Sequence, residues 1–132
     1  MTSSHLDRFA QERLPPQQQW PELLFDLPEL QFPEQLNCAT ELLDKVVASG
    51  RGDRLCLQGP GVRWSYADVL SRANRIANLL VRDMGLVPGN RVLLRGPNNP
   101  MMAACWLAVF KAGGICVGTM PLLRAKIGRA HV

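Results

Sequence analysis

Apolar and polar positions divide the 132-residue chain into an irregular first segment and a patterned remainder. Five prolines interrupt any long helix within residues 1–33, so only a short helix around residues 6–14 is predicted there. The same segment is nevertheless rich in large apolar side chains: Trp20, Leu23, Leu24, Phe25, Leu27, Leu30 and Phe32. We interpret residues 1–33 as a Pro-rich N-terminal arm that packs along the surface of a larger body.

The next part of the chain predicts two amphipathic helices on either side of a hairpin. Asn37 is placed to cap a helix that Gly50 ends, and its apolar positions recur at helical spacing: Ala39, Leu42, Leu43, Val46 and Val47. Short strand patterns at residues 54–58 and 62–65 are joined across residues 59–61, which predicts a β-hairpin.

Ser65 and Asp68 have the spacing of a capping box and predict the start of a longer helix. Gly85 is placed to end that helix. The apolar stripe between them is predicted to face the core: Val69, Ala73, Ile76, Ala77, Leu80 and Met84.

The most apolar part of the chain predicts a strand, a helix and a second strand. Residues 91–95 have a continuous apolar centre, which is typical of a strand covered on both faces. Pro100 opens a helix over residues 101–112 that is apolar nearly all round and is therefore predicted to lie deep, and residues 115–117 resemble a buried strand. Residues 91–119 thus predict a βαβ unit with parallel strands, and the chain an α/β fold.

Charge and hydropathy exclude several classes of protein. The formal net charge is +4, from 15 Lys and Arg against 11 Asp and Glu, and the basic residues are scattered singly, so no nucleic-acid partner is expected. The N-terminus lacks the apolar run of a signal peptide, and the most hydrophobic run is well short of the roughly 20 residues that a spanning helix requires. We expect a cytoplasmic protein with no membrane partner.

The chemistry-bearing side chains form no recognisable catalytic or metal-binding pattern. Cys38, Cys56, Cys105 and Cys116 lack C-x-x-C spacing and are expected to be free thiols that behave as small apolar residues in a reducing compartment. The two histidines, His5 and His131, lie near the chain ends, so a zinc site or a histidine base for a serine is not expected. No catalytic residue and no metal ligand is therefore assigned.

Two kinds of loop are candidate ligand sites. The glycines at 113–114 and 59–61 are interpreted as a helix end and a turn, because the first pair follows its helix and the second lacks a phosphate-holding Lys. Arg95 and the loop at residues 96–99 are the better candidate, because ligands of open α/β sheets lie at the carboxyl ends of the strands. Turn formation explains the same loop residues, so the cofactor-binding residues stay unknown.

Three segments occur in an order and at intervals that resemble the opening of the adenylate-forming superfamily, also called AMP-binding enzymes. They are Trp-Ser-Tyr-Ala-Asp-Val-Leu at residues 64–70, Gly-Leu-Val-Pro-Gly-Asn-Arg-Val at 85–92, and Trp-Leu-Ala-Val-Phe-Lys-Ala-Gly-Gly at 106–114, followed by Pro-Leu-Leu-Arg at 121–124. The second matches the family's Gly-Val-x-x-Gly-Asp-x-Val turn, with Asn90 where Asp is commoner. The resemblance covers residues 32–125 and implies the N-terminal part of the family's large domain, incomplete as given.

Within that family, residues 94–98, residues 119–124 and the arm look most similar to benzoate- and 2-aminobenzoate-type CoA ligases. The resemblance implies an acid–thiol ligase that activates an aromatic carboxylic acid with ATP to an acyl-adenylate and transfers the acyl group to coenzyme A. ATP, Mg²⁺ and coenzyme A are the implied cofactors of the full-length enzyme.

The family's working motifs have no counterpart in this chain. These are the Ser/Thr/Gly-rich phosphate loop with its Lys, the Tyr-Gly-x-Thr-Glu segment, the ribose-binding Asp and the catalytic Lys of the C-terminal lid. The resemblance places them downstream, so we expect a fragment that is inactive and binds no cofactor by itself. Residues 34–125 are expected to be a partial AMP-binding domain. Residues 126–132 are expected to be a non-native tail, because codons for Ile-Gly-Arg-Ala-His-Val can spell a common sequencing adapter.

Two alternatives remain open at this point. The chain can be a stand-alone α/β interaction module without catalysis, or a small nucleotide-binding domain that acts alone. The first predicts a stop codon shortly after residue 125 in an independent clone, and the second predicts measurable ATP binding by the 132-residue chain.

Overall fold

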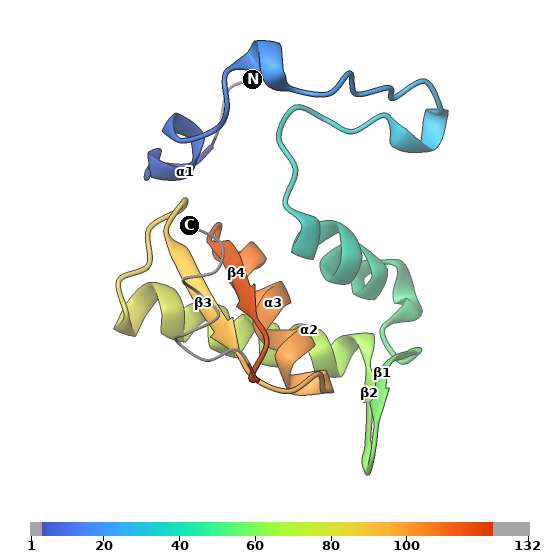
Figure 1. Ribbon diagram of the computed structural model, residues 1–132. Helices are drawn as coiled ribbons and strands as arrows, with labels where there is room; N and C mark the ends of the chain where they lie inside the picture. The colour runs from blue at the N-terminus through green and yellow to red at the C-terminus, as the bar shows by residue number, and fades with distance from the viewer. Residues whose placement is uncertain (1–3, 123–132) are drawn as a thin grey trace.

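The computed structural model describes residues 4–122 and shows an arm that passes beside a packed body (Figure 1). The arm contains α1 (Phe9–Glu12) and two single 3₁₀ turns, η1 (Gln17–Gln19) and η2 (Pro28–Leu30). The helix expected at residues 6–14 is therefore present but short. Most large apolar side chains between residues 20 and 32 are exposed. The surface on which they were expected to pack is not formed by the residues that the structure describes.

The first helical segment after the arm is confirmed, with one correction to its apolar face. The Asn37 side-chain oxygen accepts hydrogen bonds from the Ala39 and Thr40 amides at 3.1 and 3.2 Å, and Gly50 ends the segment at φ +78°. The segment contains two π-helical stretches, η3 (Thr40–Asp44) and η4 (Val47–Arg51). Because π turns close i→i+5 hydrogen bonds, side chains rotate less per residue than the 3.6-residue period assumes. Leu43 is accordingly buried, whereas Leu42 is 57% exposed.

The predicted hairpin and the long helix after it are also present. Strands β1 (Leu55–Gly59) and β2 (Val62–Ser65) pair antiparallel and lead into α2 (Tyr66–Asn78), which η5 (Leu79–Asp83) extends. Ser65 Oγ accepts from the Asp68 amide at 3.1 Å, and the Asp68 carboxylate accepts from the Ser65 amide at 3.0 Å, so the capping box is confirmed.

The predicted stripe of this helix is buried over most of its length. Val69, Ala73, Ala77 and Leu80 face the core. Met84 was predicted to join them but is 69% exposed. The reason is the end of the helix at Gly85, where the Leu86 amide turns back to the Leu80 carbonyl at 2.9 Å.

The βαβ unit at residues 91–119 is confirmed. Strand β3 (Arg91–Arg95) and strand β4 (Ile115–Thr119) run parallel, in register from Arg91 opposite Ile115 to Arg95 opposite Thr119. Helix α3 (Pro100–Lys111) connects them and begins where the Asn99 side chain accepts from the Met102 amide at 2.9 Å.

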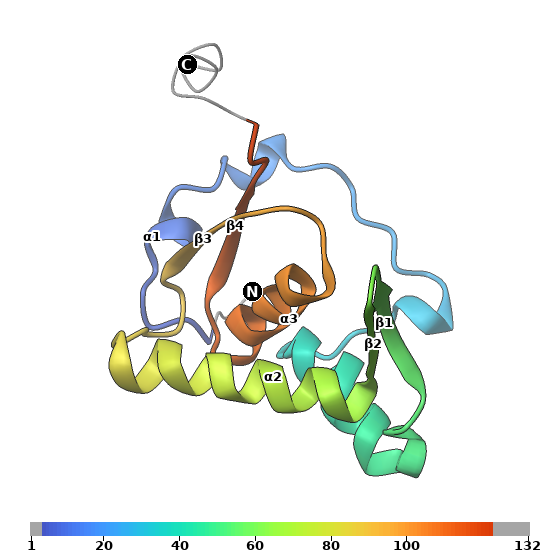
Figure 2. The same ribbon diagram turned by 90° about the horizontal axis from the view of Figure 1, so that it is seen from below.

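The core lies where three helical segments meet. Helix α3 packs between α2 and the β3–β4 pair (Figure 2). The central cluster is small because several of its members are alanines: Leu43, Val69, Ala73, Ala77 and Ala108. Alanines let helix axes approach closely but bury little apolar surface per residue.

The expectation that β3 is covered on both faces is wrong for the described residues. Val92 and Leu94 are half-buried, whereas Leu93 is 64% exposed and Val117, its neighbour on β4, is 40% exposed. Helix α3 covers one face of the strand pair, and no described element packs on the other. The outer edges of β3 and β4 are likewise unpaired within residues 4–122. Helix α3 is less deep than predicted, since only Ala104, Ala108 and Val109 are fully buried.

Candidate functional site

The carboxyl ends of β3 and β4 lie side by side, as the sequence predicted for a ligand edge (Figure 1). Arg95 Nη2 donates to the Pro121 carbonyl at 2.8 Å and ties the end of β3 to the chain after β4. Asn99 caps α3, and a Cβ on Gly96 would come within 2.6 Å of Met102 Cε. These contacts explain the loop as a turn and a helix start, and ligand contact there stays a prediction.

The glycine pairs have the structural roles that the sequence indicated. Gly113 follows α3 at φ +76°, and its amide and that of Gly114 donate to the Phe110 and Val109 carbonyls at 3.0 and 2.8 Å. Their amides are therefore used to end the helix. Gly61, at φ +68°, forms the turn of the β1–β2 hairpin.

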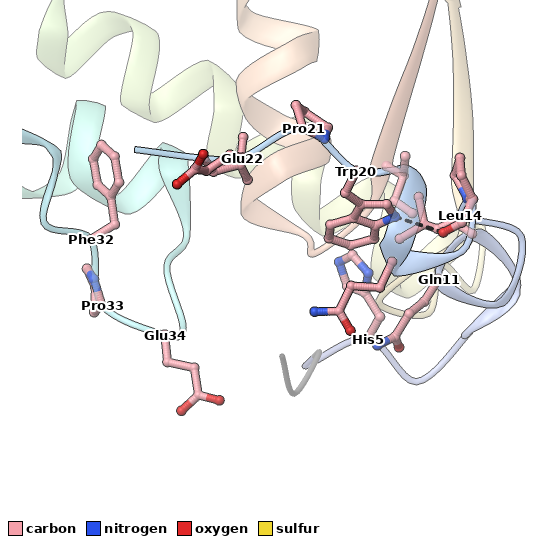
Figure 3. Close-up of a pocket in the computed structure, with 14 residues that line it drawn as sticks. His5, Gln11, Leu14, Trp20, Pro21, Glu22, Phe32, Pro33 and Glu34 are labelled. Carbon is pink, nitrogen blue, oxygen red and sulfur yellow. Dashed lines mark hydrogen bonds between the residues drawn. The ribbon is translucent and has the colours of Figure 1, made fainter. Parts of the chain in front are cut away.

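A cleft of about 1190 Å³ lies between the arm and the beginning of β4 (Figure 3). It is thus at the amino end of the strands, opposite to the ligand edge. His5, Gln11 and Trp20 lie on one side, and Phe32 and Glu34 on the other. Trp20 Nε1 is held by the Pro15 carbonyl at 2.7 Å.

The charges of this cleft do not suit an anionic ligand. The described residues of its lining include the carboxylates of Glu22 and Glu34 and no Lys or Arg. These residues therefore offer no fixed positive charge to a carboxylic acid or a nucleotide.

A second cleft of about 790 Å³ lies at the end of α3. Two polar side chains of its lining, Asn37 and Lys111, join helical segments. Lys111 Nζ contacts both oxygens of the Asp44 carboxylate at 2.5 and 2.6 Å, and Asn37 Nδ2 donates to the Phe110 carbonyl at 2.9 Å. We interpret these contacts as structural.

The thiols are free, as predicted, and three of them have raised pKa values. Burial raises the pKa of Cys116 to about 11, and the nearby Cys105 thiol adds to the effect. Burial also raises the pKa values of Cys56 and Cys105. A thiol with a raised pKa is protonated at neutral pH and is a poor nucleophile. Cys38 differs from the prediction, because it is exposed and does not fill an apolar environment.

One charged cluster joins the arm to the turn before β3 and has no local signal in the sequence. Asp7, in the arm, accepts hydrogen bonds from the Phe9 amide, from Asn90 and from Arg91, and these partners hold the pKa of its carboxyl below the ordinary value. Asp7 and Asn90 are 83 positions apart, so no local pattern connects them.

Within residues 4–122, no group of three or more His, Cys, Asp or Glu side chains is placed to hold a metal ion. None of the described helices is both long enough and apolar enough to cross a bilayer.

Comparison with known proteins gives a consistent family. Residues 44–127 match the family described as AMP-binding enzyme. The salicyl-AMP ligase / salicyl-S-ArCP synthetase of Mycobacterium tuberculosis is 39% identical over 82 residues, which are 62% of this chain and 14% of that protein. An acetyl-coenzyme A synthetase of Mycobacterium bovis is 33% identical over 85 residues, which are 60% of this chain and 13% of that protein.

The fold has solved counterparts. The anthranilate CoA ligase AuaEII, solved in complex with anthranoyl-AMP, superposes with a TM-score of 0.66 at 23% identity over 76% of this chain and 19% of that chain. At this identity the likeness shows the fold alone. The α/β arrangement thus matches the N-terminal part of such enzymes, and the chain spans about one seventh of the length of the two curated relatives named above.

Proposed function

Because the chain belongs to the family of AMP-binding, adenylate-forming enzymes, we propose that it supplies the N-terminal part of an ATP-dependent carboxylic acid ligase. The carrying observation is the match of residues 44–127 to that family. In the proposed reaction, a carboxylate oxygen displaces pyrophosphate from the α-phosphorus of ATP. The thiol of coenzyme A then attacks the acyl carbon, forms a thioester and releases AMP.

The acid is proposed to be aromatic. Two findings support this: the 39% identity to a ligase whose name specifies salicyl, and the similarity of residues 94–98 to benzoate-type enzymes. The relative named acetyl-coenzyme A synthetase, at 33% identity, supports acetate as the competing choice of acid. The clefts among the described residues do not decide between the two, because neither presents an unengaged cation to a carboxylate.

The 132-residue chain is proposed to be inactive by itself, and its organisation to follow the family match. Residues 1–33 would be an arm, residues 34–125 a partial AMP-binding domain, and residues 126–132, which lie outside the described part, a non-native tail. Charge that develops during adenylation needs positioned donors and Mg²⁺. ATP, Mg²⁺ and coenzyme A would bind to groups that the full-length enzyme supplies.

The first experiment is to sequence the gene beyond codon 125 in an independent clone. We expect the reading frame to continue into a Ser/Thr/Gly-rich segment that contains a Lys. A stop codon at that point would contradict the ligase proposal and favour a stand-alone α/β interaction module.

The second experiment measures pyrophosphate release by the longer gene product with matched acids: benzoate, 2-aminobenzoate, salicylate and acetate, each with and without coenzyme A. We expect kcat/KM for an aromatic acid to exceed that for acetate by about tenfold or more, because the acids differ by a whole ring in an apolar pocket. Preference for acetate would overturn the aromatic assignment and keep the ligase. No turnover of any acid would overturn both.

Calorimetry on the 132-residue chain is the third measurement. We expect no heat of ATP binding. Saturable ATP binding would instead favour a small nucleotide-binding domain that acts alone.

A further inference from the structure

Near its beginning, the arm is held against the body by backbone and side-chain contacts. Residues 5–9 lie across the turn that leads into β3, at the amino end of that strand (Figure 1). The amides of Leu6 and Asp7 both donate to the Pro88 carbonyl, at 3.0 and 2.9 Å. A Cβ on Gly89 would come within 2.2 Å of the Asp7 carbonyl oxygen, so only glycine permits this approach of the two backbones.

The Asp7 side chain adds a charged layer to these backbone contacts. Its carboxylate accepts from the Phe9 amide at 3.0 Å, from Asn90 Nδ2 at 2.7 Å and from the Arg91 guanidinium. The Arg91 guanidinium also lies over the Phe9 ring, 4.6 Å from its centre. Hydrogen bonds to a charged partner are stronger than neutral ones, and a cation over an aromatic face is attracted to it.

We propose that residues 5–9 form a latch that holds the arm closed against the amino end of β3, and that Asn90 is the residue that permits closure. Asn90 has two simultaneous roles: its oxygen accepts from the Val87 amide at 3.0 Å, and its amide nitrogen donates to Asp7. A carboxylate at position 90 would keep the first contact but would set a second negative charge 2.7 Å from the Asp7 oxygen. The turn accepts either side chain, whereas the closed arm requires the amide.

Latching determines whether the large cleft exists. His5, Gln11 and Leu14, from the latched end of the arm, line the cleft together with Ile115 of β4 (Figure 3). The other end of the arm is held at Asn37, which caps the following helix and binds the end of α3. With both ends held, the intervening segment is a closed loop. With the latch open, the Asn37 end stays held and the cleft loses the wall that His5, Gln11 and Leu14 form. This inference does not depend on which acid is activated.

The test is amide hydrogen exchange of the 132-residue chain, followed in peptides that contain Leu6 and Asp7. We expect Asn90→Asp to accelerate exchange of these amides by about tenfold or more, because their protection depends on local opening of the arm. Asn98→Asp makes the same chemical change on the exposed loop after β3, and we expect it to leave the arm amides unchanged. Exchange of α2 amides reports whether the body stays folded.

A double variant makes the test specific. In Asp7→Asn with Asn90→Asp the amide and the carboxylate exchange places, so part of the lost protection should return. Asp7→Ala changes only the arm and should release it while α2 stays protected. Unchanged arm exchange in Asp7→Ala, or no recovery in the double variant when α2 is intact, would overturn the latch. If Asn90→Asp also accelerates exchange of the α2 amides, the arm exchange of Asp7→Ala alone determines whether the latch is supported or overturned.

Discussion

Three asparagine side chains show how single residues organise this chain. The side-chain oxygens of Asn37 and Asn99 accept hydrogen bonds from backbone amides at the starts of their helices. The Asn90 oxygen accepts a hydrogen bond from the Val87 amide in the turn before β3. An aspartate would also accept these bonds. Only an amide can donate at the same time, as Asn37 does to Phe110 and Asn90 does to Asp7. The choice of Asn therefore links a local cap to a distant segment.

The cysteine residues are expected to differ in reactivity. At pH 8 we expect a maleimide to label exposed Cys38 quickly and Cys116 slowly, because a pKa of about 11 leaves only about one thiolate in a thousand. The Cys116 rate should continue to rise as the pH approaches 11. Mass spectrometry of the labelled peptides measures this order, with Cys38→Ser as the control. Equal labelling at pH 8 would contradict the burial of Cys116.

Helix packing carries the stability of the elements. The cluster around Leu43 joins η3, α2 and α3, while the adjacent Leu42 points to solvent. Other links reinforce the same junction, notably the contact of Lys111 with Asp44. That pair is partly exposed, so apolar burial is expected to contribute more than the charges do.

Two neighbouring leucines form a matched pair of variants. Leu43→Ala should lower the free energy of unfolding by about 2–5 kcal/mol, because it leaves a cavity in a small core. Leu42→Ala removes the same atoms from a side chain that is 57% exposed. This variant should change the free energy of unfolding by about 0.5 kcal/mol or less. Urea denaturation followed by circular dichroism measures both. Similar losses in the two variants would contradict the position of the π-helical turns.

For the whole molecule, the uncovered apolar surface is the main consequence of the fold. The open face of the β3–β4 pair exposes Leu93 and Val117, and many arm side chains are exposed as well. Strand edges and apolar faces of this kind promote association between copies. We therefore expect the 132-residue chain to be poorly soluble when expressed alone. A sharp, cooperative melt of a monomer would contradict this expectation.

Neighbouring side chains of β3 point to opposite faces, so substitutions on each face can test whether the open face causes self-association. Leu93→Lys places a charge on the open face and should reduce self-association in sedimentation velocity without loss of helical circular dichroism. Val92→Lys places the same charge on the half-buried side and should destabilise the body. The reverse pattern would show that the strand faces are assigned wrongly.

The sequence by itself determined the caps, the turns, the ends of the longer helices and the parallel pairing of residues 91–119, because these follow from residues within a few positions of each other or from one short crossover. The ordered motifs likewise led to the family. Only the tertiary structure decided that Leu42 is exposed, that one face of β3 is open, that the Cys116 thiol is held protonated and that Asp7 meets Asn90. Each of these depends on what packs against a residue from far along the chain, and neither periodicity nor spacing carries that information.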